Sequence, residues 1–507
     1  MTTVAPKGLC IRLDARAGSL QTQIYREIRR SILDGVLAPA NRLPSSRALA
    51  LDLGVSRTTT LIAYEQLMAE GYLDARRGSG TYVADELPDD LPQVRSVPKS
   101  AIRHPPISRR GAAMAKVPAM GVRIPGPPRP FRLGVPGLDL FPIRLWTQLV
   151  TRRLRSATLA QLDYGDTAGI LPLREAIADH VRSARGTRCH ADQVIVTAGA
   201  QRGVDLICHL LLDPGDEAWL EEPGYAGARA ALIAAGVRVL PAPVDEDGLR
   251  VDLIARARRR SRLAYVTPSH QFPLGVPMSL ARRLALLKWA GQARAWVIED
   301  DYDSEFRYRT RPLPCLHGLD VDGRVIYVGS FSKTLMPALR LGFLIVPPDL
   351  RDRILAVRRT TELHPPVLDQ LTLADLMNGG HFDRHVRRMR AAYEERLQAL
   401  EAAAAARCAG ILTLRPVHTG LHAVADLHGA DAGRVCEDAR TRGVEVMPLS
   451  AYYADPTRAP NALVLCFASS PPQTLSSGVE RLADAIEAVG RADRPRRARV
   501  IGARATG

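Results

Sequence analysis

The sequence lacks long apolar runs and paired cysteines. No stretch of its 507 residues approaches the roughly 18 consecutive apolar residues that a membrane-spanning helix requires, so no membrane span is expected. The opening residues, MTTVAPKGLCIRLDARAG, lack the apolar region and cleavage site of a secretory signal, so we expect a cytoplasmic protein. The seven cysteines are scattered, odd in number and without a CxxC pair, which argues against a disulfide framework and against a zinc site. We therefore predict reduced thiols and no metal.

Length and charge indicate more than one domain. A chain of 507 residues exceeds the size at which a single hydrophobic core usually stops growing. The net charge of +16 is uneven, because residues 1–130 carry 19 Lys and Arg against 11 Asp and Glu, and residues 491–507 carry 6 against 1. A basic N-terminal module is typical of a protein that binds a polyanion, although a solvated basic surface gives the same composition.

The N-terminal region carries the pattern of a helix-turn-helix. Three helices are predicted, over residues 20–34, 45–54 and 56–71. In the first, Ile24, Ile28 and Ile32 recur at helical spacing. The second opens at one of two adjacent serines and the third at another serine, and Gly54 and Gly71 mark their ends. The start of the third helix would enter the major groove of DNA.

A predicted β-hairpin over residues 72–85 completes this region. Its RRGSG turn combines arginines with glycines that allow close approach of a backbone. The block resembles the GntR-type winged helix through LPSSRALA, GVSRTTT, AYEQLMAEGYL and GSGTYV, in that order. The resemblance implies a DNA-binding domain over residues 13–84, with these contacts to operator DNA: Arg47, Ser56, Arg57, Thr59, Gly78 and Gly80. A helical protein-interaction module is the alternative interpretation.

The next segment, residues 85–130, contains ten prolines and no sustained apolar period. Proline-rich chain favours the extended polyproline II conformation, so a semi-rigid linker is predicted here. A second domain is expected over residues 131–490, followed by a basic tail over residues 491–507.

From residue 131 onward, short apolar runs alternate with helical segments. The runs include VIVT, AWLEE, LAYV, AWVIED, VIYVGS and GFLIV. Such alternation predicts an α/β domain with a mostly parallel sheet. Ligands bind these sheets at the carboxyl ends of the strands, so the polar residues that follow the runs are the candidate site.

Three of these strand ends carry groups that suit pyridoxal phosphate. After VIVT, Gly199, Ala200 and Gln201 open a helix whose free N–H groups favour a phosphate. The acidic cluster DDYD follows AWVIE, and SFSK with Lys333 follows VIYVG. A lone lysine is usually a solvated charge. A phosphate cradle, a carboxylate for the pyridine nitrogen and a Schiff-base lysine, in this order, are the parts that the cofactor requires.

The second domain resembles fold-type I aminotransferases, and the whole chain resembles MocR-type regulators, which join a GntR-type winged helix to such a domain. The resemblance implies that Lys333 in SFSKT is the Schiff-base lysine, that Asp300 pairs with the pyridine nitrogen, and that Tyr302 lies near the cofactor's phenolic oxygen. It implies four contacts to the phosphate, from Ala200, Gln201, Ser330 and Arg340. Tyr225 would stack on the ring, and His270 and Gln271 would lie beside it. Tyr164 would reach the phosphate of the partner subunit in a homodimer.

The chain departs from this resemblance at three places. Residues 461–470 contain no arginine, although aminotransferases carry there the arginine that clamps a substrate carboxylate. Gly227 stands where the GABA-responsive member of the family has a second such arginine, and Phe272 replaces a cofactor-binding asparagine. These departures argue against an α-amino acid or GABA as effector and against efficient turnover. Amines, sulfonates and the vitamin itself stay open.

These features predict an α/β chain with an N-terminal winged helix-turn-helix domain and a large aminotransferase-like domain that binds pyridoxal phosphate. The function expected from them is a transcriptional regulator that binds operator DNA, senses a small molecule and dimerises. A working aminotransferase with an appended DNA-binding module is the second interpretation. A domain that has lost the cofactor and only dimerises is the third.

Overall fold

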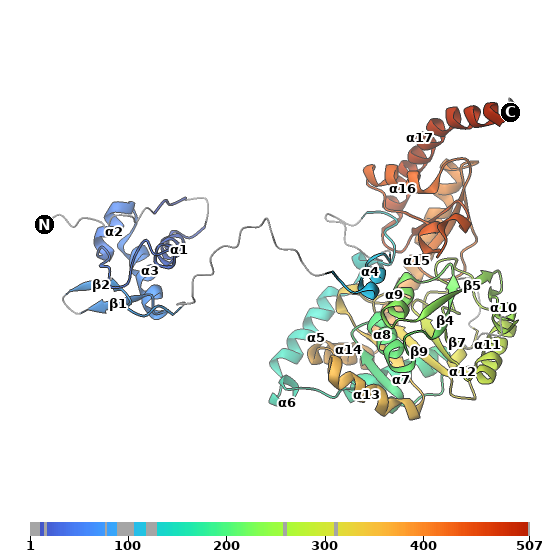
Figure 1. Cartoon of the computed structure of the whole chain (residues 1–507), viewed down its shortest axis with the longest axis horizontal. Helices are drawn as coiled ribbons and strands as arrows, with labels where there is room; N and C mark the ends of the chain where they lie inside the picture. The colour runs from blue at the N-terminus through green and yellow to red at the C-terminus, as the bar shows by residue number, and fades with distance from the viewer. Residues whose placement is uncertain are drawn as a thin grey trace. The chain divides into compact units, whose positions relative to one another are not determined.

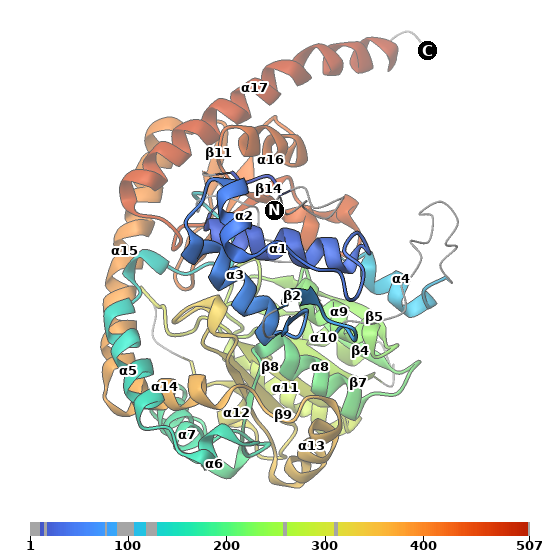
Figure 2. The same cartoon turned by 90° about the vertical axis from the view of Figure 1, so that its left-hand side faces the viewer.

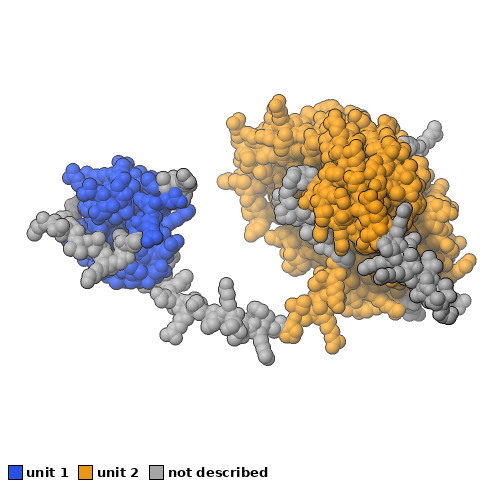
Figure 3. Space-filling view, turned by 90° about the horizontal axis from the view of Figure 1, so that it is seen from above, with its two compact units in different colours: residues 1–105 blue, residues 106–507 orange. Residues whose placement is uncertain are grey.

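The computed structural model describes residues 11–14, 18–76, 79–88, 106–117, 129–256, 261–308 and 313–504, with side chains up to residue 492. The chain divides into two compact units, Met1–Pro105 and Pro106–Gly507 (Figure 3). Among the described residues, no helix combines the length and the hydropathy of a membrane span.

The first unit is a winged helix. Its elements are α1 (Leu20–Leu33), α2 (Ser46–Leu53), α3 (Arg57–Ala69), β1 (Leu73–Arg76) and β2 (Gly80–Val83). The three predicted isoleucines of α1 are buried in its core. Ser45 is the N-cap of α2 and accepts a hydrogen bond from the Ala48 N–H (3.1 Å), while Gly54 ends the helix with a φ of 66°. The strands pair antiparallel as the wing, so the predicted fold of this region is confirmed.

The second unit is built on a large sheet in the strand order β3-β10-β9-β8-β7-β4-β5-β6 (Figure 1). The strands are β3 (Val194–Thr197), β4 (Glu217–Glu222), β5 (Arg238–Asp245), β6 (Gly248–Leu249), β7 (Ser261–Val266), β8 (Trp296–Asp301), β9 (Val325–Ser330) and β10 (Gly342–Ile345). The pairs from β5 to β9 through β4, β7 and β8 are parallel, as predicted. β10 runs antiparallel to both of its neighbours.

Helices cover both faces of this sheet. They are α7 (Leu171–Arg185), α8 (Ala200–Leu211), α9 (Ala226–Ala234), α10 (Val251–Arg256), α11 (Leu280–Ala293), α12 (Leu316–Leu319), α13 (Pro348–Thr361) and α14 (Val367–Asn378). Neighbouring residues of β3 point to opposite faces: Ile195 packs with Val204 of α8, whereas Val194 and Val196 pack with Ile177 of α7. The result is a three-layer α/β arrangement, and ligands bind such sheets at the carboxyl ends of the strands.

The chain enters and leaves this core through further elements. Those before the sheet or in its loops are α4 (Arg109–Ala115), η1 (Leu138–Leu140), α5 (Ile143–Arg155), α6 (Leu159–Leu162), η2 (Ala191–Gln193) and η3 (Pro337–Leu339). Those after it are α15 (His381–Arg407), β11 (Leu412–Leu414), β12 (His422–Leu427), α16 (Ala432–Thr441), β13 (Met447–Pro448), η4 (Leu449–Tyr452), η5 (Pro456–Arg458), β14 (Ala462–Cys466) and α17 (Pro472–Arg504). Figure 2 shows α15 running along the unit toward the C-terminal strands and α17.

Two segments differ from the extended linker and separate tail that the sequence predicts. Residues 106–117 contain α4, because the Ser108 hydroxyl accepts a hydrogen bond from the Gly111 N–H (3.0 Å) and the alanines that follow favour a helix. This part of the linker belongs to the second unit. At the other end, α17 continues through the boundary predicted at residue 490.

Candidate cofactor site and DNA-binding surface

Asp300 lies near the carboxyl end of β8 with one oxygen bonded and one free. Its Oδ2 accepts a hydrogen bond from the Tyr265 hydroxyl, and its buried Oδ1 has no hydrogen-bond partner among the described residues. Burial raises the pKa of Asp300 to about 7, against the opposing effects of the Tyr265 hydroxyl and of Lys333. A buried acceptor without a partner is costly, and a protonated ring nitrogen would satisfy it.

Lys333 lies in the turn that follows β9. Its Nζ donates a hydrogen bond to the carbonyl oxygen of Gly134, 2.7 Å away. Removal from water lowers the pKa of the Lys333 amine below its ordinary value, although Asp303 and Asp300 pull in the other direction. A lysine with a lowered pKa is neutral more often at pH 7, which is the form that attacks an aldehyde.

The start of α8 forms an anion cradle. Gly199 is its N-cap, with a φ of 85° and no side-chain cap, so the first N–H groups of the helix are available. A Cβ at Gly199 would come within 2.9 Å of Arg340 Nη2, which donates to the Ala198 carbonyl (3.1 Å). A side chain at residue 199 would therefore displace the Arg340 guanidinium, which lies beside Gly199.

Sheet register brings Ser330 to the same edge as this cradle. Gly342 of β10 pairs with Thr197 on one side and with Ser330 on the other. A Cβ at Gly342 would lie 2.8 Å from the backbone nitrogen of Ala200. The predicted phosphate ligands therefore gather at one edge of the sheet: Ala200, Gln201, Ser330 and Arg340.

Tyr225 and Gln201 border the space beside Asp300. Tyr225 is the N-cap of α9, and its ring stacks on Tyr265 with centroids 6.4 Å apart. Burial raises the pKa of Tyr225 to about 12. Gln201 Nε2 donates to the Gly227 carbonyl (2.8 Å), and its buried Oε1 has no hydrogen-bond partner among the described residues.

A buried polar chain lies on another side of Asp300. His270 Nδ1 is 2.9 Å from Asp303 Oδ2 and 3.0 Å from the Tyr302 hydroxyl. His422 lies next to His270, with ring centroids 4.9 Å apart, and its Nε2 is 3.0 Å from the Pro273 carbonyl. His270, Asp303 and His422 bring potential metal-ligand atoms within 4.8 Å of one another, but hydrogen bonds already use His270 Nδ1 and His422 Nε2.

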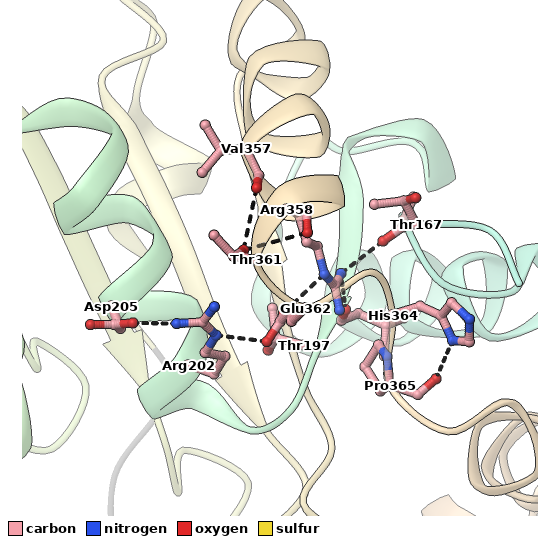
Figure 4. A network of polar contacts seen from close by, with 12 residues as sticks. Thr167, Thr197, Arg202, Asp205, Val357, Arg358, Thr361, Glu362, His364 and Pro365 are labelled. Atoms are coloured by element: carbon pink, nitrogen blue, oxygen red, sulfur yellow. Dashed lines mark hydrogen bonds and ion pairs between the residues drawn. The ribbon is translucent and has the colours of Figure 1, made fainter. Parts of the chain in front are cut away.

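A network of arginines connects the cradle to α13 (Figure 4). Arg202, next to Gln201 in the first turn of α8, donates from Nε to Glu362 Oε2 at 2.6 Å. Glu362 also pairs with Arg358 Nε (2.9 Å). Arg358 is fully buried, and its Nη1 donates to the carbonyls of Thr167 (2.9 Å) and Val196. Arg358 therefore holds β3 to the loop that precedes α7, and Glu362 connects it to Arg202 of the cradle helix.

Tyr164 lies on that loop but away from the other predicted cofactor residues of its own chain. The Gly165 N–H donates to His364 Nε2 (2.8 Å), and the Tyr164 ring meets the His364 ring edge-on at 6.4 Å. Its side chain is 81 % exposed. Among the predicted cofactor ligands, Tyr164 and Arg340 are thus exposed on the described surface.

The three departures from aminotransferases meet near the same ring-binding space. Val464 is fully buried in β14 and belongs to an apolar cluster with Phe272, Leu449 and Tyr452, which we call the aromatic cluster. A Cβ at Gly227 would lie 2.2 Å from Gln201 Oε1 and 2.4 Å from Tyr225 Cζ. Any side chain at residue 227 would displace two predicted cofactor ligands, so an arginine is excluded there with this arrangement.

The predicted DNA contacts gather on the first unit. Ser56 is the N-cap of α3, and its Oγ accepts from the Thr59 N–H at 3.1 Å and lies 2.7 Å from Thr59 Oγ1. Arg57 and Arg47 are exposed at the starts of α3 and α2. Gly80 opens β2, and a Cβ there would meet Arg42 Nε at 3.0 Å. Gly78 lies outside the described residues.

Comparison with known proteins identifies both parts of the chain. The model of the bacterial regulatory proteins of the gntR family matches residues 20–83, and that of aminotransferase class I and II matches residues 143–482. The chain is 40 % identical to the probable rhizopine catabolism regulatory protein MocR of Rhizobium meliloti, over 93 % of this chain and 94 % of that protein. This chain belongs to the MocR-type transcriptional regulators.

Other relatives agree with the MocR-type assignment. The HTH-type pyridoxine biosynthesis transcriptional regulator PdxR of Corynebacterium glutamicum is 34 % identical, over 92 % of this chain and 96 % of its own. The α-aminoadipate aminotransferase LysN of Thermus thermophilus, solved with N-(5'-phosphopyridoxyl)-L-leucine, superposes with a TM-score of 0.65 at 29 % identity, over 71 % of this chain and 92 % of its own.

Pyridoxal phosphate fits the site that this MocR-type regulator presents. The orphaned Asp300 Oδ1, the uncapped start of α8 and the Lys333 amine are the acceptor, the anion cradle and the nucleophile that its nitrogen, phosphate and aldehyde require. Sequence reasoning missed Tyr265, Asp303 and Gly134, which hold Asp300, His270 and Lys333. Tyr265 lies in strand β7 and Asp303 just after strand β8, and Gly134 is distant in sequence from Lys333.

Proposed function

We propose that this MocR-type regulator senses a small molecule at Lys333 and transmits its presence to operator binding. The observation that carries the proposal is the 2.7 Å hydrogen bond from Lys333 Nζ to the Gly134 carbonyl. Gly134 lies within the large unit, in the described residues 129–137 that precede η1. The lysine amine therefore contacts the N-terminal segment of the large unit, which is the part of this unit nearer in sequence to the DNA-binding unit.

The amine chemistry of Lys333 supports this route. Pyridoxal phosphate supplies an aldehyde that forms an imine with a primary amine. Lys333 is the chain's own amine for that bond, and a primary amine effector competes with it. A free neutral amine has two N–H donors, whereas an imine nitrogen keeps at most one. The contact of the Lys333 nitrogen with the Gly134 carbonyl then differs between the lysine bonded to the cofactor and the lysine released by an amine effector. A ligand shifts an equilibrium between two states of a protein only through such a difference.

We propose that the effector is a primary amine without an α-carboxylate, or pyridoxal phosphate itself. A carboxylate is held best by a bidentate guanidinium. Residues 461–470, where aminotransferases carry such a group, contain no arginine, and Val464 and Cys466 of this segment are fully buried. At the second position, a Cβ on Gly227 would lie 2.2 Å from Gln201 Oε1. An amino acid effector would bury its carboxylate at these positions without a counter-charge, which is costly.

We also propose a homodimer, with the Tyr164 hydroxyl reaching the phosphate site of the partner subunit. Support comes from exposed apolar side chains on α5, α6 and the start of α7, which flank Tyr164: Ile143, Leu154, Leu159, Leu162 and Leu171. Large exposed apolar side chains are typical of a protein interface where they gather on one surface. Because a regulator of this family acts on operator DNA, we further propose that it works in the cytoplasm.

The test measures operator binding and reporter output for the wild type and Lys333→Ala across a ligand series. The series contains aliphatic amines, an α-amino acid, GABA, a sulfonate and pyridoxal phosphate. We expect Lys333→Ala to keep its basal DNA binding and to lose the response to amines. An unchanged response in the variant would show that signalling does not pass through Lys333. Rapid turnover of a common amino acid and a 2-oxoacid by the wild type would favour the enzyme interpretation instead.

A further inference from the structure

The exposed face of α3 carries two large apolar side chains that remain partly exposed in the described part of the unit. Leu61 is 38 % exposed and Ile62 is 39 % exposed, and Arg57 and Thr58 are exposed one turn earlier on the same face. The opposite face of α3 is buried in the unit's core through Thr60, Ala63, Tyr64 and Leu67.

The position of these residues determines what can cover them. α3 is the second helix of the helix-turn-helix, and the N-terminal half of this helix enters the major groove in proteins of this type. Residues three and four apart lie on one face, so Leu61 continues the row that Arg57 and Thr58 begin, about 6 Å further along the helix. The surface that binds DNA through Arg57 therefore extends over Leu61 and Ile62.

We propose that Leu61 and Ile62 read the C5-methyl groups of thymines in the operator. In the major groove, the thymine methyl is the one apolar feature of a base edge, and side chains recognise it by apolar contact. Neither leucine nor isoleucine can donate or accept a hydrogen bond, so a guanine, cytosine or adenine edge facing them would lose its hydrogen bonds to water without replacement. The polar residues Arg57 and Thr58 then serve neighbouring bases or phosphates, and the apolar pair selects T·A pairs in each half-site.

The experiment replaces thymines one at a time by deoxyuridine, which removes only the methyl group. The probe is a duplex that the full-length protein has selected from a random-sequence library. We expect one or two thymines in each half-site to weaken wild-type binding by about three- to fivefold when replaced, the effect of one buried methyl group. In Leu61→Ala or Ile62→Ala, binding to the unmodified duplex is weaker and the same replacement has no further effect.

A matched control is Val36→Ala, an exposed apolar residue of the same unit outside the helix-turn-helix. It should keep the full preference for thymine over deoxyuridine. The proposal is overturned if no replacement weakens wild-type binding, a result that needs no variant. It is also overturned if Leu61→Ala and Ile62→Ala keep the wild-type preference, or if these variants alter only subunit assembly or the effector response, which would assign the apolar pair to a protein contact.

Discussion

The ligand site has a cofactor end and a substrate end, which differ in how many of the groups expected from aminotransferases they contain. At the cofactor end, the predicted ligands of pyridoxal phosphate are present: Asp300, Lys333, Arg340 and the start of α8. At the substrate end, Val464 is buried among apolar side chains. At the second position of a substrate-binding arginine, a side chain on Gly227 would meet Gln201 and Tyr225.

This contrast distinguishes the groups that bind the cofactor from those that an aminotransferase uses to orient its substrate. An aminotransferase needs both ends, because its catalysis depends on orienting the substrate carboxylate while the amine reacts. A sensor needs only a reaction or contact that distinguishes two arrangements of the chain. The retained groups of the cofactor end and the altered substrate end agree with the proposal that this regulator signals through Lys333.

The largest expected effect is complete loss of the cofactor bond in Lys333→Ala. Purified wild-type protein should show a visible absorption band that borohydride removes, and the variant should have none, because no other amine is expected at the site. Lys288→Ala, which removes an exposed lysine of α11, is the matched control and should keep the band. A wild-type protein that stays colourless after addition of pyridoxal phosphate would contradict the assignment of the cofactor end.

A smaller effect is expected for Asp300→Asn. The amide can still accept from the Tyr265 hydroxyl, so the change removes the negative charge and leaves that contact in place. Loss of a charge-assisted hydrogen bond should weaken pyridoxal phosphate binding on the order of 10- to 100-fold, measured by titration of the apoprotein. Asp322→Asn, at an exposed aspartate, is the control. Equal affinity in both variants would mean that Asp300 does not contact the ring nitrogen.

The substrate end can be tested by returning an arginine to it with Val464→Arg. The guanidinium enters the aromatic cluster without a counter-charge, so we expect a less stable apoprotein, with a lower melting temperature. An α-amino acid supplies the missing carboxylate, and the concentration that perturbs the absorption band should fall by about tenfold or more.

Val464→Met is the control for this experiment, because methionine is a long side chain without a charge. It should leave the response to amino acids as in the wild type. If Val464→Arg and Val464→Met respond equally, the position does not face the bound ligand, and the missing arginine does not explain the choice of effector.

Local patterns were sufficient to predict the strands, the helix-turn-helix and the residues at strand ends. Lys333 and Asp300 follow apolar runs, and the chemistry of a strand end depends on a few adjacent residues. Ser45 was one of two candidate caps, and the hydrogen bond to Ala48 N–H distinguishes it from its neighbour. The roles assigned to the individual site residues stay predictions until they are measured.

Contacts between distant segments were beyond the reach of pattern reasoning. Tyr265 looks like an ordinary strand residue, and its hydroxyl meets Asp300 only because β7 and β8 pair in one register. The Gly134 carbonyl meets Lys333 across 199 residues of sequence. The reversed direction of β10 is likewise set by its neighbours β3 and β9 rather than by its own apolar run.

The smallest effect is expected for Tyr164→Phe, which removes one hydroxyl from an 81 % exposed ring. If this hydroxyl bonds the phosphate in the partner subunit, its loss should weaken pyridoxal phosphate binding by about two- to tenfold, the range of one hydrogen bond. The phenylalanine keeps the edge-on contact with His364, so the fold and the loop should be unchanged. The affinity is measured above and below the protein concentration at which the dimer dissociates. We expect the variant and the wild type to differ only in the dimer, because a monomer has no partner tyrosine to lose. A difference that persists in the monomer would assign the hydroxyl to its own subunit, and no difference at either concentration would remove Tyr164 from the cofactor site.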